Sequence, residues 1–165
     1  IIILFEKSLR IGDFVELADG LLGEVREINI RSTLLRTLDN ADIIVPNADF
    51  ISSQVNNWTL NDDIRRFSIS FSVAYGSDLE QVREAGLKAA EDVPITLKRK
   101  NIMPDVLVTE LGSSGVECIL TIWAQGEWVK RPGWVKSQYL TAIYNNLRAA
   151  NIEIPFPQMD VHMRS

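Results

Sequence analysis

Hydrophobic and polar positions between Ile11 and Trp58 follow the period of β-strands and not that of helices. Apolar residues at 14–17 and 43–45 predict two short strands, and Pro46 ends the second because proline cannot donate to a ladder. Residues 54–58 predict the last strand of this block. Five short strands in about 50 residues predict a small barrel, since closure removes the exposed edges of such a sheet.

The longest run in this block opens at Gly23 and alternates with a period of two. One face of the run carries Ile28, Ile30, Ser32 and Leu34. The other face carries Glu27, Asn29, Arg31 and Thr33. This alternation predicts β-strand structure along the run.

The polar segment Asn61–Asp63 predicts a domain boundary, because the pattern of the chain changes after it. The strand that follows has one apolar face, which comprises Phe67, Ile69, Phe71, Val73 and Tyr75. Ser77 with Glu80 three residues later is a capping-box pattern and predicts a helix that runs up to Pro94. The apolar positions of this helix are Leu79, Val82, Gly86, Ala89 and Val93.

The second half of this block predicts a hairpin and another helix. Residues 106–111 and 116–124 predict two strands, joined by the Gly and Ser residues at 112–115. A helix after Pro132 should end near Asn151. Its apolar stripe comprises Leu140, Ile143, Tyr144 and Leu147. The order strand, helix, strand, strand, helix predicts a ferredoxin-like split βαβ layout, with helices on one face of a mixed sheet.

The last segment, residues 152–165, cannot begin as a helix because Pro155 and Pro157 fix φ and restrict the residues before them. We expect it to be extended. Its apolar side chains are Phe156, Met159, Val161 and Met163. A segment of this composition needs a partner surface, and another copy of the chain is one candidate.

Composition limits the chemistry that the chain can carry. The 165 residues include 17 basic and 22 acidic side chains, and the net charge of −5 opposes binding to nucleic acid or anionic lipid. A chain of this length with 46% hydrophobic residues can bury a core without disulfides or metals. The single Cys118 cannot form an intramolecular disulfide, and the single His162 has no second ligand to complete a zinc site. We expect no metal and no cofactor.

Catalytic patterns are also missing from the sequence. There is no G-x-S-x-G motif, and no serine or cysteine stands in a recognisable nucleophile signature. Cys118 shares the strand parity of Val116 and Leu120, which predicts a buried packing role. The segment 112–115 lacks the lysine of a phosphate-binding loop. We therefore expect that the protein is not an enzyme and that His162 is a bystander.

The chain begins with Ile1 and not with Met. The apolar run Ile1–Phe5 is far shorter than the roughly 20 residues that a membrane-spanning helix needs. No signal peptide is recognisable either. These features suggest a fragment whose preceding residues were removed; a mature chain whose first strand is apolar is the alternative.

Several segments of the sequence resemble the cytoplasmic region of the small-conductance mechanosensitive channels, the MscS family. These segments are Ile3–Lys7, Ile11–Val15, Gly23–Val25 with Ile28, Arg31–Thr33, Arg36–Asn40, Ile43–Asn47, Val73–Tyr75 with Ser77 and Asp78, and Ile152–Gln158. They occur in the family's order and spacing across essentially the whole chain. The pore-lining helix and its gate, which family members carry upstream, are absent from this sequence.

The resemblance implies a heptameric channel in which each subunit has membrane helices, an Sm-like β domain, an α/β domain and a short strand. On this pattern residues 1–10 are the end of the pore-flanking segment. Residues 11–61 are a small Sm-like five-stranded β-barrel domain, and residues 62–152 are a ferredoxin-like split βαβ domain. Residues 153–165 are a C-terminal strand for a barrel between subunits.

The resemblance also implies a function: the cytoplasmic cage, or vestibule, of a tension-gated ion channel that releases ions and small solutes on hypo-osmotic shock. The implied partners are other copies in a heptamer, the permeating inorganic ions and small solutes, and the membrane through the missing upstream helices, but no nucleic acid. The expected location is the cytoplasmic side of a bacterial inner membrane, and the fragment alone should be soluble. An Sm-like oligomeric binding module without channel activity is the alternative.

Two groups of residues are candidate sites under this resemblance. The first lies close to the helix that flanks the pore and would couple the β domain to it; it comprises Pro46, Asn47 and Ala48. The alternative for this group is that Pro46 and Asn47 only terminate a strand. The second group would form the barrel between subunits and comprises Pro155, Phe156, Pro157, Met159 and Val161.

Overall fold

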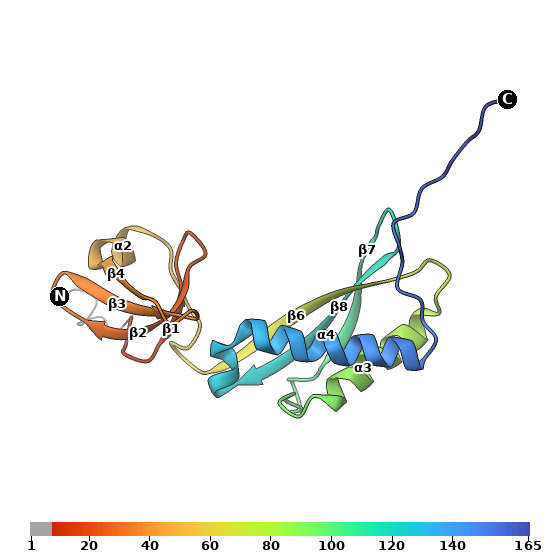
Figure 1. Ribbon diagram of the computed structural model, residues 1–165. Coiled ribbons are helices and arrows are strands. Elements are labelled where there is room, and N and C mark those ends of the chain that lie inside the picture. Colours follow the sequence, from red (N-terminus) through yellow and green to blue (C-terminus); the bar gives the residue numbers. More distant parts are fainter. Residues whose placement is uncertain (1–7) are drawn as a thin grey trace. The chain divides into compact units, whose positions relative to one another are not determined.

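A computed structural model describes residues 8–165 and divides the chain into two compact units (Figure 1). The first, here called the β unit, extends to Arg65 and includes Val129–Arg131. The second, the α/β unit, comprises Arg66–Trp128 and Pro132–Ser165. Residues 1–10 are the predicted end of a pore-flanking segment, and positions 1–7 of it lie outside the described residues.

The β unit is an antiparallel sheet of five strands, in the order β4-β3-β2-β1-β5. Its elements are β1 (Phe14–Glu16), β2 (Leu22–Ile28), β3 (Ser32–Thr37), β4 (Asp42–Pro46), the short helix α2 (Asn47–Ser52) and β5 (Asn56–Asn57). Each of the first four strands contributes one valine or leucine to a common core. That core comprises Leu9, Val15, Val25, Leu35 and Val45. The five-stranded β fold predicted for this block is confirmed.

The predicted alternation from Glu27 through Leu34 is wrong. Strand β2 ends at Ile28, the chain turns at 29–31, and β3 runs back beside β2. A β-bulge between Val25 and Glu27 shifts the register before the turn. Bulge and turn together change which positions face inward, so Thr33 is fully buried whereas Ile30 is 77% exposed.

The α/β unit contains a sheet of three strands and two long helices, shown from yellow to blue in Figure 1. Its elements are β6 (Ile64–Val73), α3 (Leu79–Asp92), β7 (Asp105–Leu111), β8 (Val116–Gln125), the 3₁₀ helix η1 (Gly126–Lys130) and α4 (Pro132–Ala149). The first two residues of β6 and the last two of η1 belong to the β unit. The sheet order is β6-β8-β7, so β8 lies between the two strands that α3 connects. This is the split βαβ layout that the sequence predicts.

Alternation along β8 supplies the centre of the α/β core. Val116, Cys118, Leu120, Ile122 and Ala124 are all buried, as the strand parity predicts. Both helices add to the same core, with Val82 and Ala89 from α3 and with Val135, Tyr139, Ile143 and Leu147 from α4. Hydrophobic burial by one face of the sheet therefore holds both helices in place.

Four details of the predicted helices and strands need correction. The N-cap of α3 is Asp78, whose Oδ1 accepts from the N–H of Glu80 at 2.9 Å, and Ser77 instead donates to the Ala74 carbonyl. Leu79, at the start of α3, is 43% exposed. On α4, Leu140 and Tyr144 are 36% and 50% exposed, because Val135 and Tyr139 occupy the buried line instead. Tyr75 lies beyond the end of β6 and is 52% exposed.

Candidate functional site

The predicted coupling residues lie where β4 ends and α2 begins. Pro46 is the last residue of β4, and Asn47 and Ala48 open α2. Pro46 and Ala48 are exposed, but Asn47 is only 7% exposed. The three positions are therefore not equivalent, since only two of them present a side chain to solvent.

The side chain of Asn47 is directed at the turn between β2 and β3. Its Nδ2 donates to the carbonyl oxygens of Asn29 at 2.9 Å and Ile30 at 3.3 Å, while its backbone N–H donates to Arg31 at 2.8 Å. Its Oδ1 accepts from the hydroxyl of Thr33 at 2.7 Å. The structure thus joins Asn47 to the segment 29–33.

Sequence reasoning missed Thr33 and this turn as parts of the coupling site. The available signal was a threonine in a strand, and threonine is common in strands for reasons of propensity alone. Its burial follows only from the bulge in β2 and from the chain reversal after Ile28.

The predicted barrel residues lie on the extended segment that follows α4. The segment is anchored at its beginning: the N–H of Ala74 donates to the Glu153 carbonyl at 2.8 Å, and the N–H of Gln158 donates to Ser114 Oγ at 3.2 Å. Pro155 is half-buried. From Phe156 onward the chain is exposed, including Phe156 at 75%, Pro157, Met159 at 83% and Val161 at 70%.

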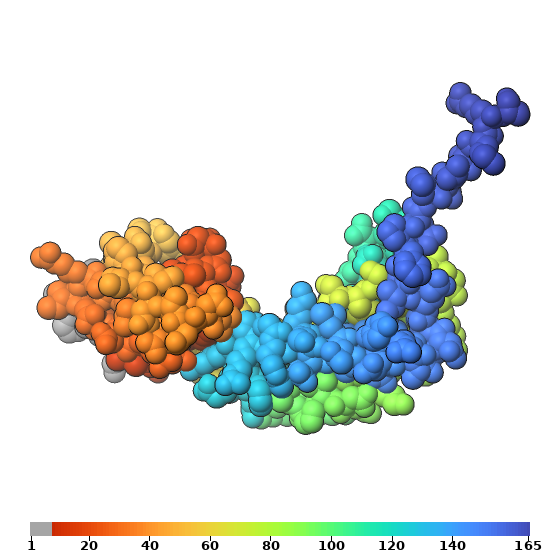
Figure 2. Space-filling model, in the orientation of Figure 1, coloured from red at the N-terminus to blue at the C-terminus, as the bar shows by residue number. Residues whose placement is uncertain are grey.

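Gly115 permits this anchor. A Cβ atom at Gly115 would lie 2.5 Å from the Val73 carbonyl oxygen and 2.7 Å from Pro155 Cγ. Such a close approach is available only to glycine. The end of the chain, dark blue in Figure 2, stands clear of the other residues of the α/β unit after this point.

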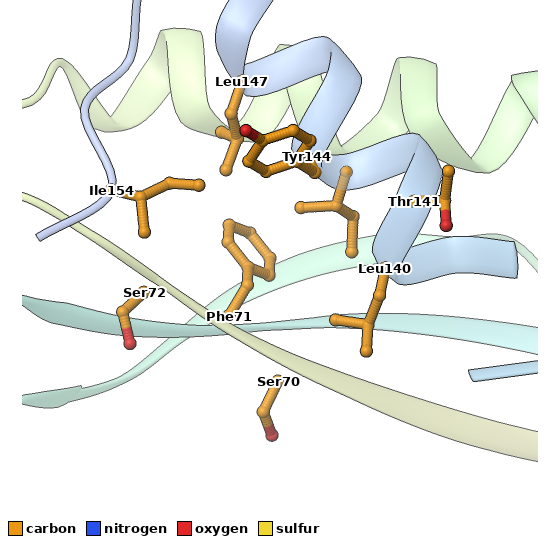
Figure 3. Close-up of a pocket in the computed structure, with 9 residues that line it drawn as sticks. Ser70, Phe71, Ser72, Leu140, Thr141, Tyr144, Leu147 and Ile154 are labelled. Carbon is orange, nitrogen blue, oxygen red and sulfur yellow. The ribbon is translucent and has the colours of Figure 1, made fainter. Parts of the chain in front are cut away.

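An apolar groove of about 460 Å³ lies between α4 and β6 (Figure 3). Phe71 projects into it from β6, and Leu140, Tyr144 and Leu147 line it from α4. Ile154, at the start of the anchored segment, closes one end. Leu140 and Tyr144, the exposed residues of the apolar stripe predicted for this helix, therefore form part of one wall of the groove.

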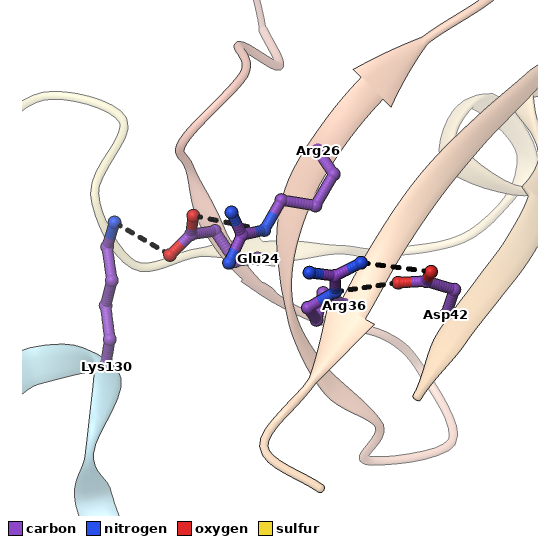
Figure 4. A network of polar contacts seen from close by, with 5 residues as sticks. All are labelled: Glu24, Arg26, Arg36, Asp42 and Lys130. Atoms are coloured by element: carbon purple, nitrogen blue, oxygen red, sulfur yellow. Dashed lines mark hydrogen bonds and ion pairs between the residues drawn. The ribbon is translucent and has the colours of Figure 1, made fainter. Parts of the chain in front are cut away.

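Charged side chains of the β unit form the two groups drawn in Figure 4. Glu24 accepts from Lys130 at 3.1 Å and pairs with Arg26 at 3.5 Å. Arg36 makes a bidentate contact to Asp42 at 2.8 and 3.1 Å, and this hydrogen bonding lowers the pKa of the Asp42 carboxyl. The side chains of Arg36 and Asp42 are 37% and 45% exposed, so this pair contributes little stability. The contact of Glu24 with Lys130 ties the segment 129–131 to the β unit.

Among residues 8–165, no group of three or more His, Cys, Asp or Glu side chains is placed to hold a metal ion. Cys118 is buried, and this burial, assisted by the charge of Glu117, raises the pKa of its thiol. A raised pKa keeps the thiol protonated and unreactive. In the same described part of the chain, no helix combines the length and apolar character that crossing a bilayer requires.

Comparison with known proteins gives a consistent family result. The family model described as "Mechanosensitive ion channel, beta-domain" matches residues 1–60, and the one described as "Mechanosensitive ion channel MscS, C-terminal" matches residues 67–154. The chain is 37% identical over its whole length to the mechanosensitive channel MscK of Escherichia coli K12. It is also 33% identical over its whole length to the miniconductance mechanosensitive channel MscM of that organism.

The crystal structure of Helicobacter pylori MscS in the closed state has a similar fold. It superposes with a TM-score of 0.85 at 29% identity, and the match covers 99% of this chain and 62% of that chain. The chain spans only 14% of the length of MscK and of MscM.

Proposed function

The chain belongs to the MscS family of mechanosensitive ion channels, and from this premise we propose that it forms the cytoplasmic cage of such a channel. In this proposal seven copies surround a vestibule beneath the pore. Membrane tension opens the pore, which releases ions and small solutes on hypo-osmotic shock. The cage holds the subunits together, and the charge on its walls biases which ions pass.

The observation that carries the proposal is the extended C-terminal segment. It is anchored through Glu153 and Gln158, and then exposes Phe156, Met159, Val161 and Met163. A single extended strand with unpaired backbone groups is not stable in water, whereas several copies can satisfy each other in a closed ladder. We infer that residues 153–165 supply one strand each to a barrel between subunits.

The oligomeric state tests this proposal directly. Native mass spectrometry of the 165-residue chain should show an assembly of several copies, with seven expected from the family. Because the described residues include no helix that could cross a membrane, a mixture of monomer and heptamer would also support the proposal. A strictly monomeric species at high protein concentration would contradict it.

We also propose that Pro46, Asn47 and Ala48 couple the β unit to the segment that flanks the pore. Ala48 is exposed in the first turn of α2, where an acidic side chain is compatible with the helix. Ala48→Asp in a channel with its membrane helices should therefore fold normally and alter the tension threshold or the rate of inactivation in patch-clamp records.

Ala18→Asp is the matched control, since Ala18 is exposed in a loop of the same unit. It adds the same charge and should leave gating as in the parent channel. If Ala48→Asp gave traces identical to those of Ala18→Asp, Pro46 and Asn47 would only terminate a strand.

A further inference from the structure

We propose that Thr33 and Asn47 are positioning residues: together they set the conformation of the turn at residues 29–31, and position 47 acts on gating through this turn. The inference rests on the coupling role proposed above for Pro46–Ala48. It adds Thr33 to that site and changes the role of Asn47 from a contact residue to an internal clamp.

The first step is that three successive carbonyl groups of the turn accept from one residue. Asn29 and Ile30 accept from Asn47 Nδ2, and Arg31 accepts from the Asn47 backbone N–H at 2.8 Å. A backbone carbonyl left without a partner in a partly buried position costs free energy. Asn47 therefore satisfies most of the polar groups that this turn presents inward.

The second step is that the turn lacks the usual means of stabilising itself. Tight hairpins favour turns with positive φ at one or both central residues, hence Gly, Asn or Asp. Here the central residues are Ile30 and Arg31, and neither has positive φ. The turn is closed by the N–H of Asn29 donating to the Ser32 carbonyl at 2.8 Å. Its geometry therefore depends on the bonds from Asn47.

The third step concerns the orientation of the Asn47 amide. Two carbonyl oxygens face one end of the side chain, so that end must be the NH₂ group, because only a donor can bond to both. The other end is then Oδ1, and it faces the hydroxyl of Thr33 at 2.7 Å. Thr33 is fully buried, so without this hydroxyl the oxygen would lose its buried donor.

Asn47 has little capacity left for a partner outside the unit. Both amide hydrogens are used within the β unit, and the residue is 7% exposed. A substitution at Asn47 can therefore affect a residue outside the β unit only through the segments to which Asn47 is hydrogen-bonded. Of these, the turn carries the large exposed side chain of Ile30, at 77%.

The experiment compares Thr33→Val with Thr33→Ser and Thr37→Val. Valine removes the hydroxyl at nearly constant volume, whereas serine keeps it. Thr37 lies on the same strand, and its hydroxyl accepts from Ala41 in a different turn, so Thr37→Val controls for the loss of a threonine hydroxyl from β3. Asn47→Asp is a second variant of the clamp, since it keeps the shape and removes both amide donors.

The first readout is hydrogen exchange of the whole chain. Thr33→Val and Asn47→Asp should each speed exchange of the Asn29 amide, which donates to Ser32, and of the amide at position 47, which donates to Arg31, by roughly tenfold. Thr33→Ser and Thr37→Val should leave these two amides as in the parent. The second readout is patch-clamp recording of a channel with its membrane helices. There Thr33→Val and Asn47→Asp should shift the tension threshold or inactivation in the same direction, and Thr33→Ser should restore the parent behaviour.

The outcomes separate this inference from the coupling proposal. A gating change with Ala48→Asp but not with Thr33→Val or Asn47→Asp would overturn the clamp and leave coupling intact. If none of Ala48→Asp, Thr33→Val and Asn47→Asp changed gating, the coupling proposal itself would be rejected. A lower melting temperature without faster exchange of the amides at positions 29 and 47 would assign Thr33 a purely structural role, and would also overturn the inference.

Discussion

Deletion of Pro157–Ser165 is expected to weaken the assembly of copies strongly while leaving the fold of both units unchanged. The deletion removes Met159, Val161 and Met163, which are 70–94% exposed in the single chain. Burial of each such side chain contributes about 1.5–3 kcal/mol at most, and the contribution is repeated in every subunit of a ring. The anchor at Glu153 and the two cores lie outside the deleted segment.

The measurement is the temperature at which the oligomer dissociates, followed by native mass spectrometry or light scattering, with circular dichroism as the check on folding. Met103→Ser is the matched control, because Met103 is 52% exposed but lies outside the C-terminal segment. It removes apolar surface without touching the proposed barrel. Equal dissociation temperatures for the truncated and intact chains would show that the segment takes no part in assembly.

Substitution of Gly86 by valine is expected to destabilise the α/β unit by about 3 kcal/mol, the upper end of the usual cost of overpacking. A Cβ atom at Gly86 would lie 2.5 Å from Val106 Cγ2, where α3 packs against β7. Val106 cannot move aside easily, because a β-branched side chain has few rotamers and Val106 is 8% exposed. For a unit of this size the melting temperature should fall by about 10 °C or more.

Thermal unfolding followed by circular dichroism measures this effect. Gly133→Ala is the control, since no atom lies within 4 Å of the Cβ position of Gly133 near the start of α4. Combining Gly86→Ala with Val106→Ala should recover stability that Gly86→Ala alone loses, because the second change removes the clashing methyl group. Unchanged melting of Gly86→Val would contradict the close packing of α3 on β7.

The sequence alone determined most of the α/β unit. The alternation in Phe67–Val73 and along 116–124, the Gly and Ser turn between 111 and 116, and the two helical stretches all correspond to observed elements. These patterns are readable because a strand or helix that covers one face of a core repeats its apolar residues with its own period. The two prolines likewise predict the extended C-terminal segment, since they exclude a helix locally.

Finer features depended on tertiary structure. Leu140 and Tyr144 share the helical spacing of Ile143, yet they line a groove, because the position of α4 on the sheet selects Val135 and Tyr139 for burial. Asp78 caps α3 in place of Ser77, since the path of the chain from Ala74 directs the serine hydroxyl back to that carbonyl.

The coupling site shows the same division most clearly. Pro46, Asn47 and Ala48 could be selected from the sequence, because they stand at a strand end within a recognisable family pattern. The partnership of Asn47 with Thr33 and with the turn at 29–31 could not. A bulged residue in β2 and the turn after Ile28 together decide which positions of β3 face inward, and hydrogen bonds between residues 14 to 18 positions apart leave no periodic trace in the sequence.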